Sequence, residues 1–195
     1  MRSIKTRVAL AALLVAGPAL AQSARAPRQG FNISFGFGGG SAGLTCPDCS
    51  TDRENAPSMY LRIGGALRPS LVLAGEINGW SKTETEAGID GTVTIATVNA
   101  VAQYYPNPAN GFFISGGLGA GSMEVEIKAP GFGTFSDNTT GLGYQFGAGF
   151  DIPMKGTFSL TPFVTFFGTA GGKVESSDEK LDANVVQFGL GFSWR

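Results

Sequence analysis

The chain has 195 residues, of which 30 are glycine, two are cysteine and none is histidine. Hydrophobic residues make up 43% of it, which is too much for a disordered chain, and the glycines do not follow the period of collagen. Three of the 14 Lys and Arg lie in the first seven residues, so 11 remain against 15 Asp and Glu, and this net charge of about −4 argues against nucleic acid as a partner.

The N-terminus has the pattern of a secretory signal peptide. Basic residues precede the apolar run 8–16, and Ala19 and Ala21 supply the small side chains that signal peptidase requires. The run is too short to cross a bilayer as a helix, which takes roughly 20 apolar residues, so residence in a membrane would have to come from strands. We expect a signal peptide over residues 1–21 with cleavage after Ala21, a short periplasmic lead over 22–30 and one domain of strands over 31–195.

Eight segments of the mature chain alternate apolar residues with small or polar ones, which is the period of a β-strand. The sixth and the last are the clearest. In the fourth we expect Val98, Ala100, Ala102 and Tyr104 to face outward, whereas the seventh leaves both parities open because apolar residues occupy both. In chain order the segments are 31–38, 58–67, 71–78, 92–105, 112–120, 142–152, 158–167 and 185–195.

The fifth segment changes phase along its length. Ile114 and Leu118 lie on one parity, but beyond Gly121 the apolar residues are Met123 and Val125, on the other parity. Either a β-bulge shifts the strand, or the strand has left the membrane at that point.

The connections alternate between long and short. Prolines mark the short ones, because proline cannot donate to a strand ladder. Eight strands with this rhythm place both termini at the end of the domain that carries the short turns. The long connections are 39–57, 82–90, 129–140 and 171–184, and the short ones are 68–70, 106–110 and 153–156.

The eight segments, their loop rhythm and a closing strand with an aromatic end resemble the small outer-membrane β-barrels of the OmpA and OmpX type, over essentially the whole mature chain. The resemblance implies an all-β fold, an eight-stranded antiparallel up-and-down transmembrane β-barrel in the bacterial outer membrane. It implies a monomer that is surrounded by outer-membrane lipid and lipopolysaccharide and inserted by the barrel assembly machinery. The closing strand would be the assembly signal, although Arg195 follows the last aromatic residue here. Its apolar face consists of Val186, Phe188, Leu190, Phe192 and Trp194.

A secreted soluble barrel or sandwich would also alternate. Such a protein would place its apolar residues inside and its charges outside. Here the outward faces carry Phe, Leu, Ile and Tyr on nearly every segment, and the charges collect in the connections, which favours the membrane barrel.

The register of the second and third segments predicts an ion pair in the barrel interior. Leu67 and Leu71 both face outward, so the turn 68–70 holds an odd number of residues and the two leucines pair. This register places Arg62 opposite Glu76, with Cβ atoms about 5 Å apart. Both side chains would point into the lumen, where an unpaired charge is costly.

No catalytic, cofactor-binding or metal-binding residue is expected. Enzymes with an outer-membrane barrel fold typically use a histidine as general base, and the chain has no histidine. Glu124 and Glu126 share one face of a strand and could in principle act as paired carboxylates. A solvated strand rim above the bilayer is the stronger interpretation of this pair.

Cys46 and Cys49 have the spacing of a redox motif, but the sequence predicts no helix that begins beside them. As half of a zinc site they lack a second pair of ligands. In an oxidising compartment a local disulfide in the first long connection is the simplest outcome.

Three function classes remain. The first is a non-catalytic barrel with a structural, envelope-integrity or surface-interaction role, acting through its long extracellular connections. The alternative is a narrow channel or a transporter of small hydrophobic ligands or lipids, although side chains are expected to fill an eight-stranded barrel. An enzyme is the third and the least favoured.

Overall fold

The computed structural model describes residues 28–46, 49–50, 52–131, 133–154, 156–174 and 180–195. The predicted signal peptide and most of the predicted lead therefore lie outside the described residues. Within the described ranges, no helix is long and apolar enough to span a membrane.

The described residues form eight long strands and two strands of two residues. The long strands have 15 to 18 residues each. In chain order the elements are β1 (Gly30–Cys46), β2 (Cys49–Ser50), β3 (Glu54–Arg68), β4 (Leu71–Glu86), β5 (Ile89–Tyr104), β6 (Phe112–Ala129), β7 (Gly133–Phe150), β8 (Ile152–Pro153), β9 (Phe158–Val174) and β10 (Lys180–Trp194).

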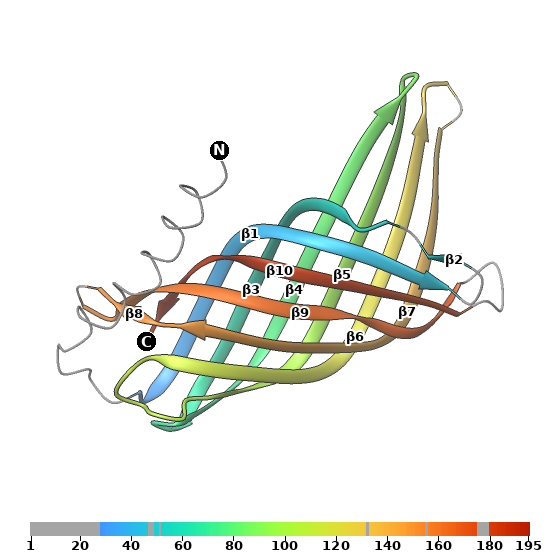
Figure 1. The fold of residues 1–195 in the computed structure, drawn as a ribbon. Helices are drawn as coiled ribbons and strands as arrows, with labels where there is room; N and C mark the ends of the chain where they lie inside the picture. Colours follow the sequence, from blue (N-terminus) through green and yellow to red (C-terminus); the bar gives the residue numbers. More distant parts are fainter. Residues whose placement is uncertain (1–27, 47–48, 51, 132, 155, 175–179) are drawn as a thin grey trace, which may run out of the picture.

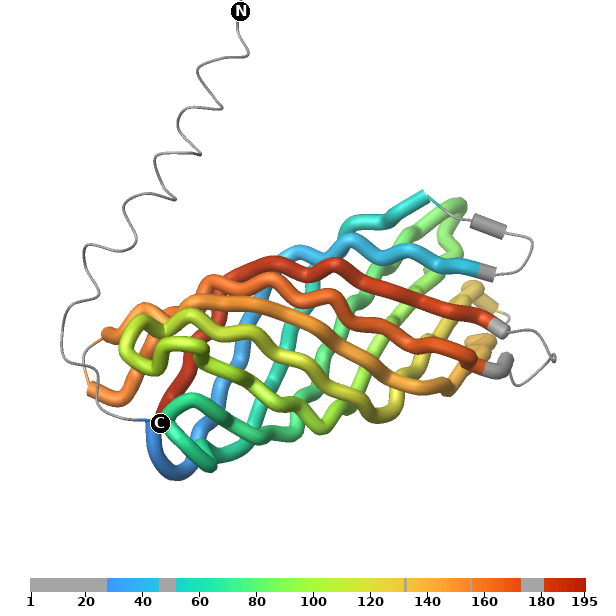
Figure 2. Tube along the Cα trace, turned by 60° about the horizontal axis from the view of Figure 1, so that its bottom comes forward, coloured from blue at the N-terminus to red at the C-terminus, as the bar shows by residue number. Residues whose placement is uncertain are grey.

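The long strands close into a barrel (Figures 1 and 2). Each pairs antiparallel with the next long strand along the chain, and β10 pairs with both β9 and β1. The two short strands are additions at the ends, since β2 pairs with β1 and β8 with β9. The prediction of an eight-stranded antiparallel up-and-down barrel is confirmed. We call the end that carries the first described residue, Arg28, and the last residue, Arg195, the turn end, and the opposite end the hairpin end.

The long connections predicted at the hairpin end are wrong, because strand continues into all four of them. β4 and β5 stay paired up to Glu86 and Ile89, and β6 and β7 up to Ala129 and Gly133. These extensions carry polar side chains such as Thr83 on one face and few apolar ones on the other, so the alternation that identified strands elsewhere is weak there.

Four of the strands rise beyond the closed part of the barrel (Figure 1). The β3–β4 ladder ends at the pair of Ser58 with Trp80, and the β7–β9 ladder ends at the pair of Thr139 with Val174. Since β5 and β6 remain paired up to Asp90 and Lys128, the two hairpins form one four-stranded sheet. We call this the projecting sheet; it comprises residues 82–94 of β4 and β5 and 124–138 of β6 and β7.

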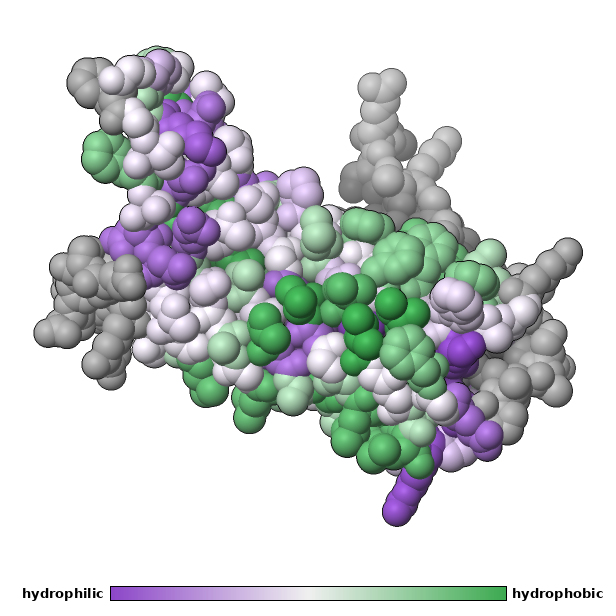
Figure 3. All heavy atoms as spheres, turned by 180° about the vertical axis from the view of Figure 1, so that it is seen from behind, coloured by the Kyte–Doolittle hydropathy of each residue, from purple (hydrophilic) through white to green (hydrophobic). Residues whose placement is uncertain are grey.

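The outward faces of the barrel form an apolar belt, and hydrophobic side chains gather over the barrel in Figure 3. The outward direction predicted for Val98 and Tyr104 is confirmed, and so is that of the closing strand. In β9 the open parity is now decided: Val164 and Phe166 face outward, whereas Phe163 and Phe167 point inward and are only 8% and 0% exposed. Members of the belt include Phe35, Leu61, Ile77, Leu118, Phe146, Phe188, Leu190 and Trp194.

The interior has two layers of different polarity. Toward the turn end it is mainly polar, with one small buried apolar group of Val72, Tyr105 and Phe113, and toward the hairpin end it holds a larger buried apolar cluster that we call the plug. This layering explains the phase change in the fifth predicted segment: Met123 faces inward into the plug, and Glu124 faces outward. The ladders of β6 with β5 and β7 have no register shift, so the bulge predicted as one option is wrong. The plug consists of Ala42, Trp80, Ile95, Met123, Phe167, Ala183 and Val185.

Glycines on the closing strands make room for aromatic rings in the lumen. The ring of Tyr60 lies across Gly36 and Gly191, which are Cα partners on β1 and β10, and a Cβ atom at either position would clash with it. In the same way Trp80 lies against Gly40. Many of the inward-facing positions of β1 and β10 are thus glycine because the packing of the lumen leaves no room for a side chain there.

Candidate functional sites at the two ends of the barrel

Arg62 and Glu76 form an ion pair in the polar layer of the lumen. They are Cα partners on β3 and β4, and the Arg62 Nε–H donates to Oε2 of Glu76. Both side chains are buried, and the guanidinium carbon lies 5.2 Å from the ring centre of Tyr60. This pairing is the one that the register argument predicts.

The predicted pairing of Leu67 with Leu71 across a three-residue turn is wrong. Two residues, Pro69 and Ser70, make the turn, and Arg68 pairs with Leu71. Leu67 is the extra residue of a β-bulge, which shifts the register by one position between Ala66 and Arg68. The bulge compensates for the shorter turn, so Arg62 still lies opposite Glu76.

Asp151 organises a second polar cluster at the turn end. Its carboxylate accepts hydrogen bonds from the Tyr105 hydroxyl at 3.0 Å and the Thr161 hydroxyl at 2.8 Å. Arg195 donates to it at 2.6 Å, and a nitrogen of Arg28 lies 3.5 Å away. The residues that flank the first and last strands are therefore tied to one carboxylate.

Arg28 seals this end of the lumen. Its guanidinium carbon lies 3.4 Å from the ring centre of Tyr105, and its Nη1–H donates to the carbonyl oxygen of Pro108 at 2.8 Å. Only 2% of the residue is exposed. Arg28 lies in the range expected as a periplasmic lead, and its side chain packs against the turn end of the barrel.

Neutral polar side chains fill the lumen between the clusters and the plug. The amide of Asn78 donates to Gln145 at 2.7 Å, and that of Asn99 donates to Thr97 at 3.0 Å. The cavity found beside the turn-end cluster has a volume of only about 10 Å³. The described side chains thus leave almost no free space at this level of the interior.

A pocket of about 130 Å³ opens above the plug at the hairpin end. Its floor includes Trp80, whose indole N–H donates to the carbonyl oxygen of Gly40 at 2.9 Å. Lys82 bridges Glu54 on β3 and Glu84 on β4, the two strands that separate there. Hydrogen bonds to these two carboxylates raise the pKa of Lys82 above its ordinary value, so the ammonium group stays charged. The pocket is lined by Ala42, Leu44, Asp52, Glu54, Trp80, Lys82, Glu84, Gly91 and Val93.

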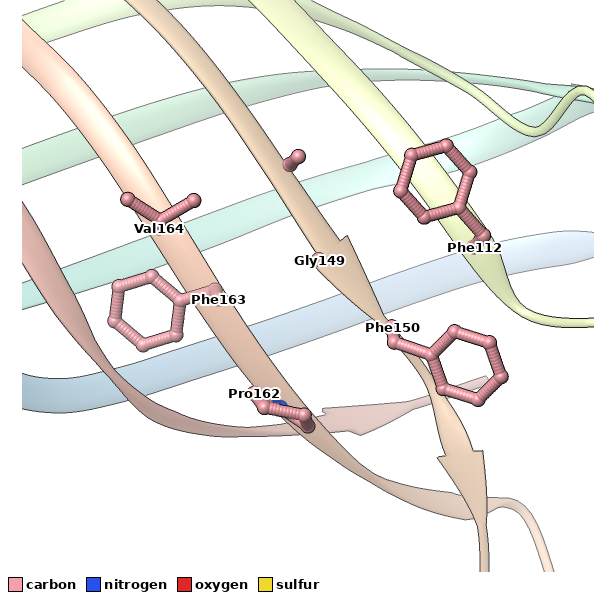
Figure 4. Close-up of a pocket in the computed structure, with 7 residues that line it drawn as sticks. Phe112, Gly149, Phe150, Pro162, Phe163 and Val164 are labelled. Carbon is pink, nitrogen blue, oxygen red and sulfur yellow. The ribbon is translucent and has the colours of Figure 1, made fainter. Parts of the chain in front are cut away.

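Two further grooves lie on the barrel and are almost wholly apolar. One of about 350 Å³ lies where the β7–β9 ladder is interrupted at Pro162, which has no N–H to donate (Figure 4). Phe112, Phe150 and Val164 line it from three strands. The other, of about 550 Å³, has small residues such as Ala100 and Gly116 in its lining. Neither offers the convergent polar groups that orient a specific ligand.

The remaining predicted positions are as follows. Cys46 and Cys49 are Cα partners across β1 and β2, but their side chains lie outside the description, so the disulfide remains a prediction. Glu124 is exposed, and Glu126 pairs with Lys128 on the outer face of the projecting sheet. The described residues contain no group of three or more His, Cys, Asp or Glu side chains that could hold a metal ion.

Sequence reasoning missed the turn-end cluster and the plug. The sequence pattern predicts that Asp151 points inward, because it lies between the outward residues Phe150 and Ile152. Its partners Arg28, Tyr105 and Arg195 come from distant parts of the chain, and no local pattern joins them. One sign of the plug was present in the sequence: apolar residues such as Phe167 occupy positions at which small or polar side chains alternate elsewhere.

Comparisons with known proteins agree with this architecture. Residues 8–195 match the family described as outer membrane protein beta-barrel domain. The structure of Ail, the attachment invasion locus protein of Yersinia pestis, in complex with the heparin analogue sucrose octasulfate, aligns with a TM-score of 0.58 and 20% identity, over 84% of this chain and 99% of that one. Neisserial surface protein A aligns with a TM-score of 0.56 and 12% identity, over 84% of this chain and 96% of that one. These identities are low and show a common fold; no curated protein sequence gives a significant match.

Proposed function

Because the chain belongs to the outer membrane protein β-barrel domain family, we propose that it is a non-catalytic surface protein that contacts partners outside the cell through its hairpin end. The protein is an integral protein of the outer membrane, and the apolar belt is the surface that faces lipid and, in the outer leaflet, lipopolysaccharide. In barrels of this kind the short turns face the periplasm, so the projecting sheet lies outside the cell.

The projecting sheet is the observation that carries the proposal. Its two hairpins extend the strands well beyond the closed part of the barrel (Figure 1). Neither insertion in lipid nor closure of the barrel requires these residues, since β3 and β9 no longer pair with the sheet there. An ordered sheet held rigidly outside the membrane is suited to presenting a fixed surface to a partner.

The filled lumen counts against the alternative of a channel. The ion pair of Arg62 with Glu76 and the Asp151 cluster occupy the polar layer, and the plug lies above them. A solute would have to displace buried, hydrogen-bonded side chains at several levels. The apolar grooves on the barrel surface are open to lipid and provide no path through the barrel.

The partner need not be the one that a relative binds. Ail was solved with a polysulfated ligand. Each described hairpin of the projecting sheet here carries three acidic residues and one lysine, which would repel a polyanion. These residues are Lys82, Glu84, Glu86 and Asp90 on the first hairpin and Glu124, Glu126, Lys128 and Asp137 on the second.

The proposal is tested by removing the projecting sheet alone. Ser81 pairs with Thr94, and Glu124 pairs with Asn138, so residues 82–93 and 125–137 can each be replaced by an Asn-Gly turn without a change of register. Cells that produce this variant should insert the barrel but lose adhesion to host-cell or neighbouring-cell surfaces. Unchanged adhesion would contradict the proposal, and a stable single-channel conductance of the intact barrel in planar bilayers would favour the channel.

A further inference from the structure

The lumen-side face of the projecting sheet carries an apolar strip that is exposed to water. Ile127 and Phe135 are Cα partners on β6 and β7, and Ile89 lies on the same face of β5. They are 46%, 65% and 44% exposed. Each shares the parity of a residue that points into the barrel, so the strip continues the inner face of the barrel wall outward. We call it the concave face.

Lipid does not explain these exposed apolar side chains. On the opposite face of the same four strands the side chains are polar or charged, including Thr92, Glu124 and Lys128. Acyl chains cannot lie against such a surface, so this part of the sheet stands above the bilayer. Contiguous apolar side chains in water, rimmed by polar ones, mark an interaction surface.

The charges around the strip are mainly acidic. Glu84 and Glu86 lie on the same face of β4, and Glu86 is the Cα partner of Ile89. Asp137 lies on this face of β7, opposite Val125. Among the described residues of this face the basic group is Lys82, which already pairs with Glu54 and Glu84.

We propose that the concave face docks a cationic amphipathic polypeptide segment, with apolar side chains on Ile127 and Phe135 and Lys or Arg side chains toward Glu84 and Glu86. This rests on the proposed function and specifies the class of partner. Charge complementarity selects this occupant: a sulfated polysaccharide would be repelled. A second copy of the chain would oppose its own acidic face in a face-to-face dimer.

The chain offers a matched pair of variants for the test. Glu84→Gln with Glu86→Gln removes two charges from the concave face. Glu124→Gln with Glu126→Gln removes two charges from the outer face of the same sheet. The two variants are alike in a further respect, because Glu84 pairs with Lys82 and Glu126 pairs with Lys128 two residues away.

The probe is a fluorescent 12-residue peptide of alternating Lys and Leu, titrated onto the full-length barrel in phosphatidylcholine nanodiscs, with empty nanodiscs subtracted. We expect the concave-face variant to weaken binding by about tenfold or more and the outer-face variant to leave it within about threefold. Ile127→Ser with Phe135→Ser should also weaken it, and a peptide with Glu in place of Lys should bind at the level of empty nanodiscs. A heat-induced mobility shift on an SDS gel verifies that each variant is folded.

If both charge variants lose peptide binding equally, the peptide is attracted non-specifically by net charge and the proposal is overturned. The same conclusion follows if the intact barrel binds the peptide no better than empty nanodiscs do. Either result leaves the adhesion experiment unaffected: if removal of the projecting sheet still abolishes adhesion, the surface-interaction function stands and only this class of partner is rejected.

Discussion

Two buried carboxylates, Glu76 and Asp151, anchor the polar interior, and each is paired with guanidinium groups. Removal of either Arg62 or Glu76 leaves the other charge unpaired in the lumen. Arg62→Met and Glu76→Gln should each lower the free energy of unfolding by about 3 kcal/mol or more, and the double variant should recover part of that loss. Urea unfolding in lipid vesicles measures all three. Additive single effects would show that the two groups are not coupled.

Substitution of Asp151 should lower the free energy of unfolding at least as much. Its carboxylate accepts hydrogen bonds from Tyr105 and Thr161 and also faces Arg28 and Arg195. Asp151→Asn leaves two guanidinium groups close together without a counter-charge. We expect a loss of about 3 to 5 kcal/mol in the same unfolding experiment. Asp90→Asn, at a partly exposed aspartate that accepts a hydrogen bond from Thr85, is the control and should cost less than about 1 kcal/mol. Equal effects would mean that the cluster does not stabilise the barrel.

At the scale of the element, β10 closes the barrel by pairing with both β1 and β9. A chain truncated before Val185 would keep unpaired edges on those strands inside the bilayer, where water cannot satisfy them. It should fail to assemble in the outer membrane, as judged by membrane fractionation and protease sensitivity. Deletion of Arg195 alone keeps the whole ladder and should permit assembly. A truncated chain that still folds in the outer membrane would show that β10 is not the assembly signal.

The two cysteines belong to a small element at the hairpin end. Cys46 and Cys49 are Cα partners at the tip of β1 and β2, just beyond Thr45, the last residue of β1 that pairs with β10. Cys46→Ser with Cys49→Ser should therefore leave assembly unchanged, measured as the amount of folded barrel in the outer membrane. Free-thiol labelling of the unaltered protein, with and without reductant, tests the predicted disulfide. Loss of folding in the double variant would mean that this connection contributes to the barrel itself.

At the scale of the whole molecule, every long strand has a partner on both sides within the closed part of the barrel. Unfolding has to break this ladder in a medium that offers few competing hydrogen bonds, so the barrel should resist SDS until it is heated. Boiled and unboiled samples should migrate differently on a gel. Identical mobility together with recovery in the soluble periplasmic fraction would contradict the membrane barrel.

The polarity of the wall reverses along the barrel axis. In the belt the outer face is apolar and the lumen is polar, as at Ile77 and Asn78. At the plug the inner face is apolar, and the outer face of β6 is polar there, as at Met123 and Glu124. Above the plug the inner face carries the apolar strip of Ile127 and Phe135 beside acidic side chains, and the outer face is polar. The reversal follows from the surroundings: lipid solvates the outside in the belt, whereas water solvates it above. The hairpin end is therefore built like a soluble sheet, which supports its proposed role as a surface exposed to partners.

The alignment of Arg62 with Glu76 was predicted correctly only because the bulge at Leu67 offsets an error in the assumed turn. The sequence by itself determined the fold class and the outward faces of the strands in the belt. It could do so because a strand between lipid and a narrow lumen must alternate outward apolar side chains with inward small or polar ones. A register shift of one residue would turn every side chain to the wrong face. That constraint is local, so it can be read from a single segment such as β10.

Only the tertiary structure decided the length of the strands, the plug and the turn-end cluster. In the projecting sheet neither face contacts lipid, so Thr83 or Thr92 gives no alternating signal. In β9 the sequence left both parities open, because the room that Phe167 fills in the plug exists only after closure. Arg28, Tyr105, Asp151 and Arg195 meet for the same reason: closure of β10 on β1 brings distant parts of the chain together, and no sequence period encodes that contact.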